Sequence, residues 1–475
     1  MKHSFIYSTF LISCVFTLEL QSQTQIEILN ADKISFNSAI DENRQLLKGN
    51  VKTKDNDRYL TCDSAYFYAK ENKIEAFSNI HIWQGDSLNL KGEYLIYYGN
   101  HQLAEIENNV HFTHNEMNLY SEKIKYNFKS QRCFFDQKAQ ITENMKSLSS
   151  NEGIYYTALE KFNFYKNVIV EHKEEVLYSD TLYYYLKSEL AEFKSNAIIE
   201  NNDMHITADK GWVNQKEGTG MLYGNTKMKD LKNDYTLHVD TCFIYDQLDL
   251  SVSYGNPLLS FPLNDDTLYV TADTLIHENK CDDRIFKAHP NAHFKSTEML
   301  GSCDSMSFEN KAQKVFLHKS PTIWLNEFQL TSDTITLVLE EKKLKNALLR
   351  KNSFITSKVD STSFNQISGE NMLGHFSKQE LTNIDVMGNG ESIYFVEDEK
   401  TKDIQGMNKI ICSNMNITTE NKTIENIIFF EKPDAVLIPT DKIEEKNKFL
   451  KTFIWREKEK ILDKIDVKLL LYKGF

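Results

Sequence analysis

The sequence predicts an all-β fold, a V-shaped or jellyroll-like antiparallel solenoid built from repeats of about 30 residues. Three observations predict it. A short acidic motif recurs at nearly constant spacing, a second motif lies between its copies, and apolar residues alternate within both. Alternation with a period of two is the pattern of a β-strand. A repeat of this length relaxes the usual expectation of several unrelated domains for a chain of 475 residues.

The acidic motif joins an Asp or Glu to a strand, as in YSDTLYYYL around Asp180. Apolar residues stand two and four positions after the acid, as Leu182 and Tyr184 do after Asp180. They also stand one and three positions before it, as Ala208 and Ile206 do before Asp209. The alternation therefore slips by one residue, and we expect a bulge or corner at each acid. The acid recurs at Asp32, Asp63, Glu93, Glu122, Glu152, Asp180, Asp209, Asp240, Asp273, Asp304, Asp333 and Glu370, with a degenerate copy near Ser413.

The second motif centres on a small residue or Asn, as in LLKGNVKT from Leu46. Gly and Asn tolerate unusual backbone dihedrals, so they mark a second bend. Polar turns such as AKENK from Ala69 separate the motifs and are too short for a parallel crossover. Neighbouring strands should therefore form antiparallel hairpins. Two facing sheets with an apolar interior and a fold line at the bends follow from this pattern.

The chain divides into four predicted segments. Residues 1–22 have the pattern of a signal peptide, with an early Lys, an apolar run from Phe5 to Leu18 and a polar end. Cys14 in LISC also fits a lipoprotein cleavage site, but the apolar run continues past it. Residues 23–255 and the more divergent residues 256–440 form two repeat halves that meet at a proline-containing stretch. Residues 441–475 form a cap or tail, and Asp441 to Lys451 is predicted as a short helix.

No catalytic chemistry is predicted. The sequence lacks a nucleophile elbow, a phosphate loop, a dinucleotide fingerprint and paired metal ligands, so we expect no enzyme activity, no cofactor and no metal. The repeated carboxylate should cap backbone groups at its bend, because catalysis needs one local pair and this acid recurs in nearly every repeat. The net charge of −13 argues against nucleic acid as a partner. The alternating apolar face fits an open groove and a closed core equally well.

The stretch GNVKTKDNDRYLTCDSAYFYAKENKIEAFSNIHIW from Gly49, with the repeats that follow it, resembles the OstA-like (organic solvent tolerance) family. That family includes the LptA-type periplasmic proteins of lipopolysaccharide transport, and long Bacteroidetes-type members are similar in length. The resemblance covers residues 25–260 and continues more weakly to about residue 440. It implies a β-taco or β-jellyroll fold. It also implies a non-enzymatic periplasmic bridge or chaperone that carries lipopolysaccharide toward the outer membrane.

The resemblance also implies a site and partners. Lipid A acyl chains would lie in the apolar groove with the sugars outside. The chain would meet an inner-membrane export complex and an outer-membrane translocon by end-to-end strand pairing. A structural or adhesive cell-envelope solenoid with a closed core is the alternative, and a carbohydrate-active solenoid is disfavoured by the uniform repetition of the acid. The groove-facing candidates are Ile80, Ile82, Leu95, Tyr97, Val110, Phe112, Ile124, Tyr126, Val168, Val170, Leu182 and Tyr184.

Overall fold

Nearly all of the described chain is β-structure. The computed structural model describes residues 25–36, 43–143, 145–263, 266–280, 283–377, 380–398, 401, 403–420 and 423–460. Within these ranges the chain contains 38 β-strands and six 3-10 helices, and no α-helix. The predicted all-β fold is confirmed. The predicted signal peptide, with Cys14, and the end of the predicted C-terminal segment lie outside the described residues.

The chain divides into two compact units. The first comprises Met1–Asn144 with Ile154–Ala158, and the second comprises Met145–Gly153 with Leu159–Phe475. Strand β12 (Glu152–Tyr156) and 3-10 helix η2 (Thr157–Leu159) have residues in both units. The boundary predicted between residues 255 and 256 stays a prediction. No helix in the described part of the chain is long and apolar enough to cross a membrane.

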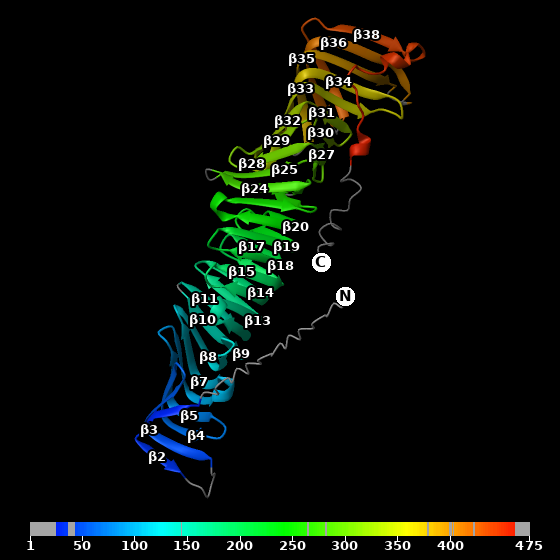
Figure 1. Ribbon diagram of the computed structural model, residues 1–475. Coiled ribbons are helices and arrows are strands. Elements are labelled where there is room, and N and C mark those ends of the chain that lie inside the picture. Colours follow the sequence, from blue (N-terminus) through cyan, green and yellow to red (C-terminus); the bar gives the residue numbers. More distant parts are fainter. Residues whose placement is uncertain are drawn as a thin grey trace, which may run out of the picture. The chain divides into compact units, whose positions relative to one another are not determined.

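From β3 to β8, consecutive strands of the first unit pair as antiparallel neighbours joined by tight turns (Figure 1). The predicted hairpin connections are therefore confirmed. A 3-10 helix, η1 (Gly99–His101), forms the turn between β6 and β7. The strands are β1 (Glu27–Asn30), β2 (Lys33–Phe36), β3 (Arg44–Asp55), β4 (Arg58–Tyr68), β5 (Lys73–Gln84), β6 (Leu88–Tyr98), β7 (Leu103–His114), β8 (Met117–Asn127), β9 (Arg132–Phe135) and β10 (Ala139–Glu143).

The second unit continues the same antiparallel pattern, but in its middle many strands are interrupted at the corner and become two short strands (Figure 1). Its 3-10 helices are η3 (Asp246–Leu248), η4 (Thr440–Lys442), η5 (Glu445–Asn447) and η6 (Glu457–Glu459). Its strands are β11 (Lys146–Ser150), β13 (Lys161–His172), β14 (Glu175–Tyr185), β15 (Leu190–Ser195), β16 (Ala197–Glu200), β17 (Met204–Ala208), β18 (Lys210–Asn214), β19 (Thr219–Asp230), β20 (Thr236–Tyr245), β21 (Leu250–Tyr254), β22 (Leu258–Leu263), β23 (Asp266–Thr271), β24 (Thr274–Lys280), β25 (Asp283–His289), β26 (Ala292–Lys295), β27 (Met299–Cys303), β28 (Ser305–Glu309), β29 (Lys314–His318), β30 (Thr322–Leu325), β31 (Phe328–Thr331), β32 (Thr334–Glu340), β33 (Lys343–Lys358), β34 (Phe364–Ser377), β35 (Glu380–Glu397), β36 (Ile404–Glu420), β37 (Thr423–Phe430) and β38 (Asp434–Pro439).

Each long strand bends into two arms, so the strands of each unit form two half-sheets that face each other. In the first unit, half-sheet A holds residues 44–48, 64–68, 73–77, 94–98, 103–107 and 123–127, and half-sheet B holds residues 51–55, 58–62, 80–84, 88–92, 110–114, 117–121 and 139–143. In the second unit, β15, β18, β21, β24, β25, β28, β29 and β32 belong to half-sheet A, and β16, β17, β22, β23, β26, β27, β30 and β31 belong to half-sheet B.

The alternation of buried residues slips at the corner, as the sequence predicts. In β14 the buried positions are Leu177 and Ser179 before Asp180, and Leu182 and Tyr184 after it. The register with β13 shifts at the same place, between Tyr165 and Val168. The bulge turns the second arm so that its apolar residues face the same interior as those of the first arm. This is the β-jellyroll, or β-taco, arrangement that the sequence predicts.

The recurrent acid holds the corner together. The backbone N–H of Asp32 donates to the carbonyl of Gly49 at 2.9 Å, and the side-chain amide of Asn50 donates to the Asp32 carboxylate at 2.9 Å. A Cβ on Gly49, whose φ is +77°, would lie 2.3 Å from a carboxylate oxygen of Asp32, so any larger residue here requires a strained backbone and a shift of the Asp32 side chain. The same amide–carboxylate pair recurs as Asn79–Asp63, Asn196–Asp180, Asn225–Asp209, Asn291–Asp273 and Asn352–Asp333.

The structural role predicted for the acid is confirmed, but its usual partner differs from the predicted one. Backbone capping occurs where Glu93 accepts from the N–H of Asn79 at 3.2 Å. Elsewhere the carboxylate mostly accepts from an asparagine side chain of the second motif, because the bulge brings the two motifs side by side. The two motifs are therefore halves of one corner.

The last described residues form a strap on the second unit. Residues 443–456 cover Phe354 and its neighbours, on the face of half-sheet B opposite to the interior, and Leu450 is buried there. Gln366 donates to the Lys448 carbonyl at 2.7 Å and accepts from the Leu450 N–H at 2.8 Å. The predicted helix between Asp441 and Lys451 is wrong, since the described chain forms only short 3-10 turns there. Hydrogen bonds from the Gln366 side chain, and not those of a helix, therefore hold this segment in place.

Candidate lipid-binding interior

The twelve groove candidates all lie inside the half-sheets and are closely packed. Each is between 0 and 6% exposed. In the first unit, Phe112 from half-sheet B packs on Tyr126 from half-sheet A with ring centroids 5.3 Å apart. In the second unit, Leu182 pairs with Phe164 and Tyr184 pairs with Phe162 in neighbouring strands. These residues form a packed core, and their assignment as a lipid groove stays a prediction.

Polar side chains close the first unit on the side away from the corner, which we call the seam. The hydroxyl of Tyr97 in half-sheet A donates to the Asp55 carboxylate in half-sheet B, and Arg58 lies 3.3 Å from the same carboxylate. Burial and the hydrogen bond to Asp55 raise the pKa of Tyr97. Further along, His114 and the Tyr155 hydroxyl are 2.8 Å apart. These buried contacts tie the two half-sheets together at their hairpin ends.

The seam of the second unit begins with a similar contact. Lys146 in half-sheet B lies against the Tyr184 hydroxyl at 3.1 Å and forms an ion pair with Glu189. Burial alone would lower the pKa of the Lys146 ammonium, but its hydrogen bonds to Glu189 and Tyr184 raise it. The lysine therefore stays charged and holds this part of the seam closed.

Beyond Lys146 the seam opens into a cleft of about 1320 Å³, measured with its solvent-filled mouth. Its floor is apolar, and the inward-facing Ile199, Ile206 and Val213 are only half-buried. Equivalent positions in the first unit, such as Ile80, are almost fully buried. The rim is polar and mainly acidic, with Glu175, Asn201, Asp203, Asp246, Asp249 and Asn279.

A partition of five side chains closes one end of the cleft: Asp230, Tyr235, His277, Arg284 and Phe286. Asp230 of half-sheet B forms an ion pair with Arg284 of half-sheet A. Phe286 packs edge-on against Tyr235 at 4.8 Å and stacks on His277 at 4.9 Å between centroids. Burial alone would raise the pKa of Asp230, but hydrogen bonds from Asn233 and the Arg284 charge lower it. Burial, followed by the charge of Arg284, lowers the pKa of His277.

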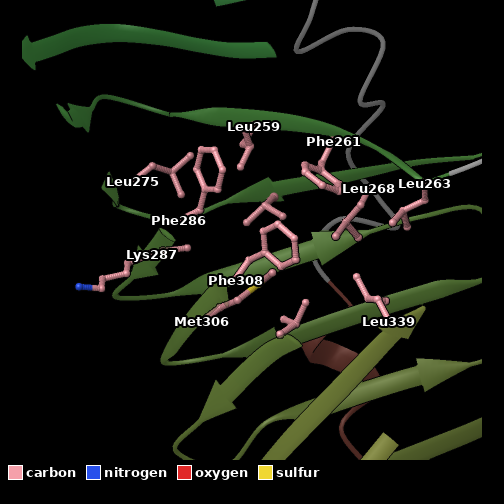
Figure 2. Close-up of a pocket in the computed structure, with 13 residues that line it drawn as sticks. Leu259, Phe261, Leu263, Leu268, Leu275, Phe286, Lys287, Met306, Phe308 and Leu339 are labelled. Atoms are coloured by element: carbon pink, nitrogen blue, oxygen red, sulfur yellow. The ribbon is translucent and has the colours of Figure 1, made fainter. Parts of the chain in front are cut away.

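On the other side of the partition lies an apolar pocket with a cavity volume of about 30 Å³ (Figure 2). The rings of Phe261 from half-sheet B and Phe308 from half-sheet A have centroids 5.1 Å apart across it. Lys287 contributes only its aliphatic stem, because its ammonium points away from the other lining side chains and forms an ion pair with Glu278 (Figure 2). The cavity is far smaller than the ~300–1,000 Å³ of ligand sites, so a ligand enters it only when the lining side chains move apart. The lining suits a hydrocarbon chain and not a charged group.

Neither the cleft, the apolar pocket nor the seam was predicted from the sequence. One signal was visible: Asp55 and Lys146 occupy inward positions of their strands, where the pattern demands apolar residues. A buried charge needs a partner, so such positions mark contacts between the half-sheets. Within the described ranges, no group of three or more His, Cys, Asp or Glu side chains could hold a metal ion.

Comparison with known proteins gives one family. Residues 23–180 match the family described as OstA-like protein. No curated protein matches the sequence. Thirteen chains of solved structures match. One is LptH from Pseudomonas aeruginosa, the LptA-homologous periplasmic component of its conserved lipopolysaccharide transport device. It shares 8% sequence identity over 24% of this chain and 82% of its own, with a TM-score of 0.22.

Proposed function

Because residues 23–180 match the OstA-like family, we propose that this chain is a non-enzymatic periplasmic carrier that moves lipopolysaccharide toward the outer membrane. The observation that carries the proposal is the interior of the second unit, where the apolar floor of a cleft is accessible and a narrow pocket has an apolar lining. Burying hydrocarbon there would contribute about 25 cal/mol per Å² removed from water. The acyl chains of lipid A are the part of the molecule that this lining accommodates.

The acidic rim of the cleft constrains how such a lipid would lie. Carboxylates such as Glu175 and Asp249 would repel lipid A phosphates at close range. We therefore place the sugars and phosphates outside the mouth, where salt screens charges over about 8 Å. Only the acyl chains would pass the rim to Ile206 and its apolar neighbours.

In the proposed function, the twelve buried candidates would contact lipid only at a later step. An acyl chain reaches Phe112 or Leu182 only when the half-sheets separate, since those side chains already fill the interior. The seam contacts of Asp55 with Tyr97 and of Lys146 with Glu189 oppose that separation. In the proposed function, loading begins at the openings of the second unit, and movement past Lys146 requires its seam contact to break.

The terminal strands are the proposed docking sites for partners. At the N-terminal end β1 and β2 each pair only with β3, and Leu29, Ile34 and Phe36 are exposed there, within the described residues. At the other end of the described chain, β37 and β38 pair with β36 and with no other described strand, and Phe430 and Leu437 are exposed. Unpaired strand edges are templates for strand addition. An inner-membrane export complex and an outer-membrane translocon would pair with these edges end to end.

Photo-crosslinking tests the proposal. A photoreactive phenylalanine analogue at Phe261 or Ile206 should capture lipopolysaccharide in cells, because both side chains line the openings. The outward residues Ile169 and Tyr183 are matched controls and should capture none. Lipid captured only from the outward positions would overturn the proposal.

One observation favours a different function, a structural envelope solenoid with a closed core. The interior of the first unit has no accessible apolar floor, as the burial of Phe112 and Ile124 illustrates. A purely structural role predicts that no lipid copurifies with the chain and that crosslinks from Phe261 and Ile206 capture only protein.

A further inference from the structure

The outer surface of half-sheet B in the first unit carries an unusual set of side chains. Along β3 to β6 the outward positions include Lys52, Lys54, Tyr59, His81, Trp83 and Lys91. Their neighbours in the same strands, such as Thr53 and Ile82, are buried in the interior. The set therefore lies on one face, which we call the cationic face. None of it contributes to the interior discussed above.

Strand register brings these residues together. Lys54 lies opposite Tyr59, and Tyr59 lies opposite Trp83. The Tyr59 and Trp83 rings stack with centroids 5.3 Å apart and an angle of 17° between planes. The Lys52 ammonium lies 5.5 Å from the Tyr59 ring and 5.8 Å from the Trp83 ring. These cations rest on aromatic rings, a contact that leaves the charge available to solvent.

A second row continues the face. His81 lies opposite Lys91, which in turn lies opposite His111. His111 stacks on the partly exposed Tyr120 at 4.5 Å between centroids. Each histidine also pairs with an asparagine of the next strand, and the His81–Asn89 distance is 3.0 Å. Seven strands, β3 to β8 and β10, contribute to half-sheet B here. With neighbouring strands about 4.8 Å apart, they give a face about 29 Å long.

The charge of this face is opposite to that of the chain. The chain has 68 acidic and 55 basic residues, yet no outward position of half-sheet B from β3 to β10 is Asp or Glu. The nearest acid in register is Glu27 of β1, opposite Lys54. Among the described residues, Lys52, Lys54 and Lys91 form no ion pair. On half-sheet A, by contrast, Lys123 pairs with Glu107 at 2.7 Å.

We propose that the cationic face binds an acidic polysaccharide strand. Aromatic side chains present flat apolar surfaces with electron-rich faces, against which the C–H faces of sugar rings pack. The lysines would bind the sugar carboxylates, and the asparagine amides would donate to hydroxyl groups. The ligand is anionic because a cationic surface on a chain of net charge −13 selects an anion by local complementarity.

A nucleic acid fits this face less well. It carries one charge about every 1.7 Å of duplex, and its affinity comes mostly from Lys and Arg that neutralise phosphates. The face offers three lysines and no arginine on the strands from β3 to β10. A polysaccharide with one carboxylate per sugar has a lower charge density that this number of cations can match. The proposal is independent of lipid binding in the interior.

Titration of the purified full chain with an oligogalacturonate of ten sugars tests the proposal. We expect binding that weakens as salt increases, and a loss of tenfold or more in affinity for the double variant Lys52→Gln/Lys54→Gln. The variant Trp83→Ala should lose a similar amount, and its circular dichroism spectrum shows whether it is folded. The variant Lys123→Gln/Lys125→Gln, on half-sheet A, is the matched control and should bind as the wild type does.

Three results would overturn the proposal. They are an absence of oligogalacturonate binding, equal losses in the cationic-face and control lysine variants, and tighter binding of a ten-nucleotide oligodeoxythymidine than of the oligogalacturonate. A maltodextrin of equal length should bind at least tenfold more weakly, since it has no carboxylates. Equal affinity for the maltodextrin would also contradict an acidic ligand. Lipopolysaccharide crosslinking from Phe261 should be unchanged in the lysine variant, which separates this site from the interior.

Discussion

The two units share one repeat and one corner, but their interiors differ. In the first unit, aromatic side chains such as Phe112 and Tyr126 fill the space between the half-sheets, and Asp55 and Tyr97 close the seam. In the second unit, Ile199 and Ile206 occupy corresponding inward positions and remain partly accessible above a cleft. The same residue type is buried at Ile82 and partly accessible at Ile206, so the two units share the repeat but differ in how closely their half-sheets pack.

The largest expected effect comes from emptying the filled interior. Phe112→Ala should lower the free energy of unfolding by about 3–5 kcal/mol, because it removes a fully buried ring and leaves a cavity. Ile206→Ala in the cleft floor should cost about 1 kcal/mol, since that side chain is already partly accessible. Urea unfolding of both variants measures the difference. Equal losses would contradict the contrast between a filled and an open interior.

The closed seam should be the next most sensitive feature. Arg58→Met removes the cation of a buried pair and leaves the Asp55 carboxylate with neutral hydrogen-bond donors, Tyr97 and Asn56, at a cost of about 3 kcal/mol. Lys345→Met, which breaks the exposed pair with Glu340, is the matched control and should change stability by less than about 0.5 kcal/mol. Denaturant midpoints of the two variants report the effect. A neutral Arg58 variant would show that the seam does not stabilise the first unit.

The corners should respond alike in both units. Gly49→Ala and Gly224→Ala each place a Cβ within 2.7 Å of an aspartate oxygen at a positive φ, so each should cost about 2–3 kcal/mol. Gly85→Ala, at a φ of +58° in open space, isolates the backbone term and should cost about 1 kcal/mol. Thermal unfolding of the three variants tests this. A large difference between the Gly49 and Gly224 variants would mean that the two corners are not equivalent.

The smallest expected effect is a pH dependence of the partition in the second unit. Burial lowers the folded-state pKa of His277, so its stabilising contribution is present above the ordinary histidine pKa of about 6.5 and is lost as pH falls. The charges that act on it are those of Arg284, Asp230, Asp249 and Glu278.

The free energy of unfolding of the wild type, measured with denaturant, should therefore decrease between pH 7.5 and 5.5. For one proton the decrease is no more than about 1.4 kcal/mol per pH unit. His277→Phe should show a shallower dependence. An identical slope in this variant would assign the effect to other groups.

The sequence was sufficient for the corner. The slip in alternation around Asp180 and the Gly-Asn pair at Gly49 both predict bends, and each bend lies where expected. Glycine, asparagine and aspartate have local conformational preferences, so their positions are informative without any knowledge of distant contacts.

Whether the interior is open could not be predicted in the same way. The seam joins residues that are far apart in sequence, such as Asp55 and Tyr97, or Asp230 and Arg284, and nothing local marks one as the partner of the other. The alternating apolar pattern is the same for a filled and an open pair of half-sheets. It shows which side chains point inward, but not how much space remains between them. The twelve candidates were therefore placed correctly as inward residues, while the accessible surface lies in other repeats.

Lipid mass spectrometry on the protein purified from its native membrane fraction tests the central claim most directly. We predict that lipid A-bearing species copurify with the wild type and are lost from Ile206→Asn, which places an amide on the cleft floor. Ile169→Asn, at an outward position of β13 in the same unit, is the matched control and should retain the lipid. Lipid absent from the wild type, or present equally in the Ile206 variant, would contradict an apolar interior that opens in the second unit to receive acyl chains.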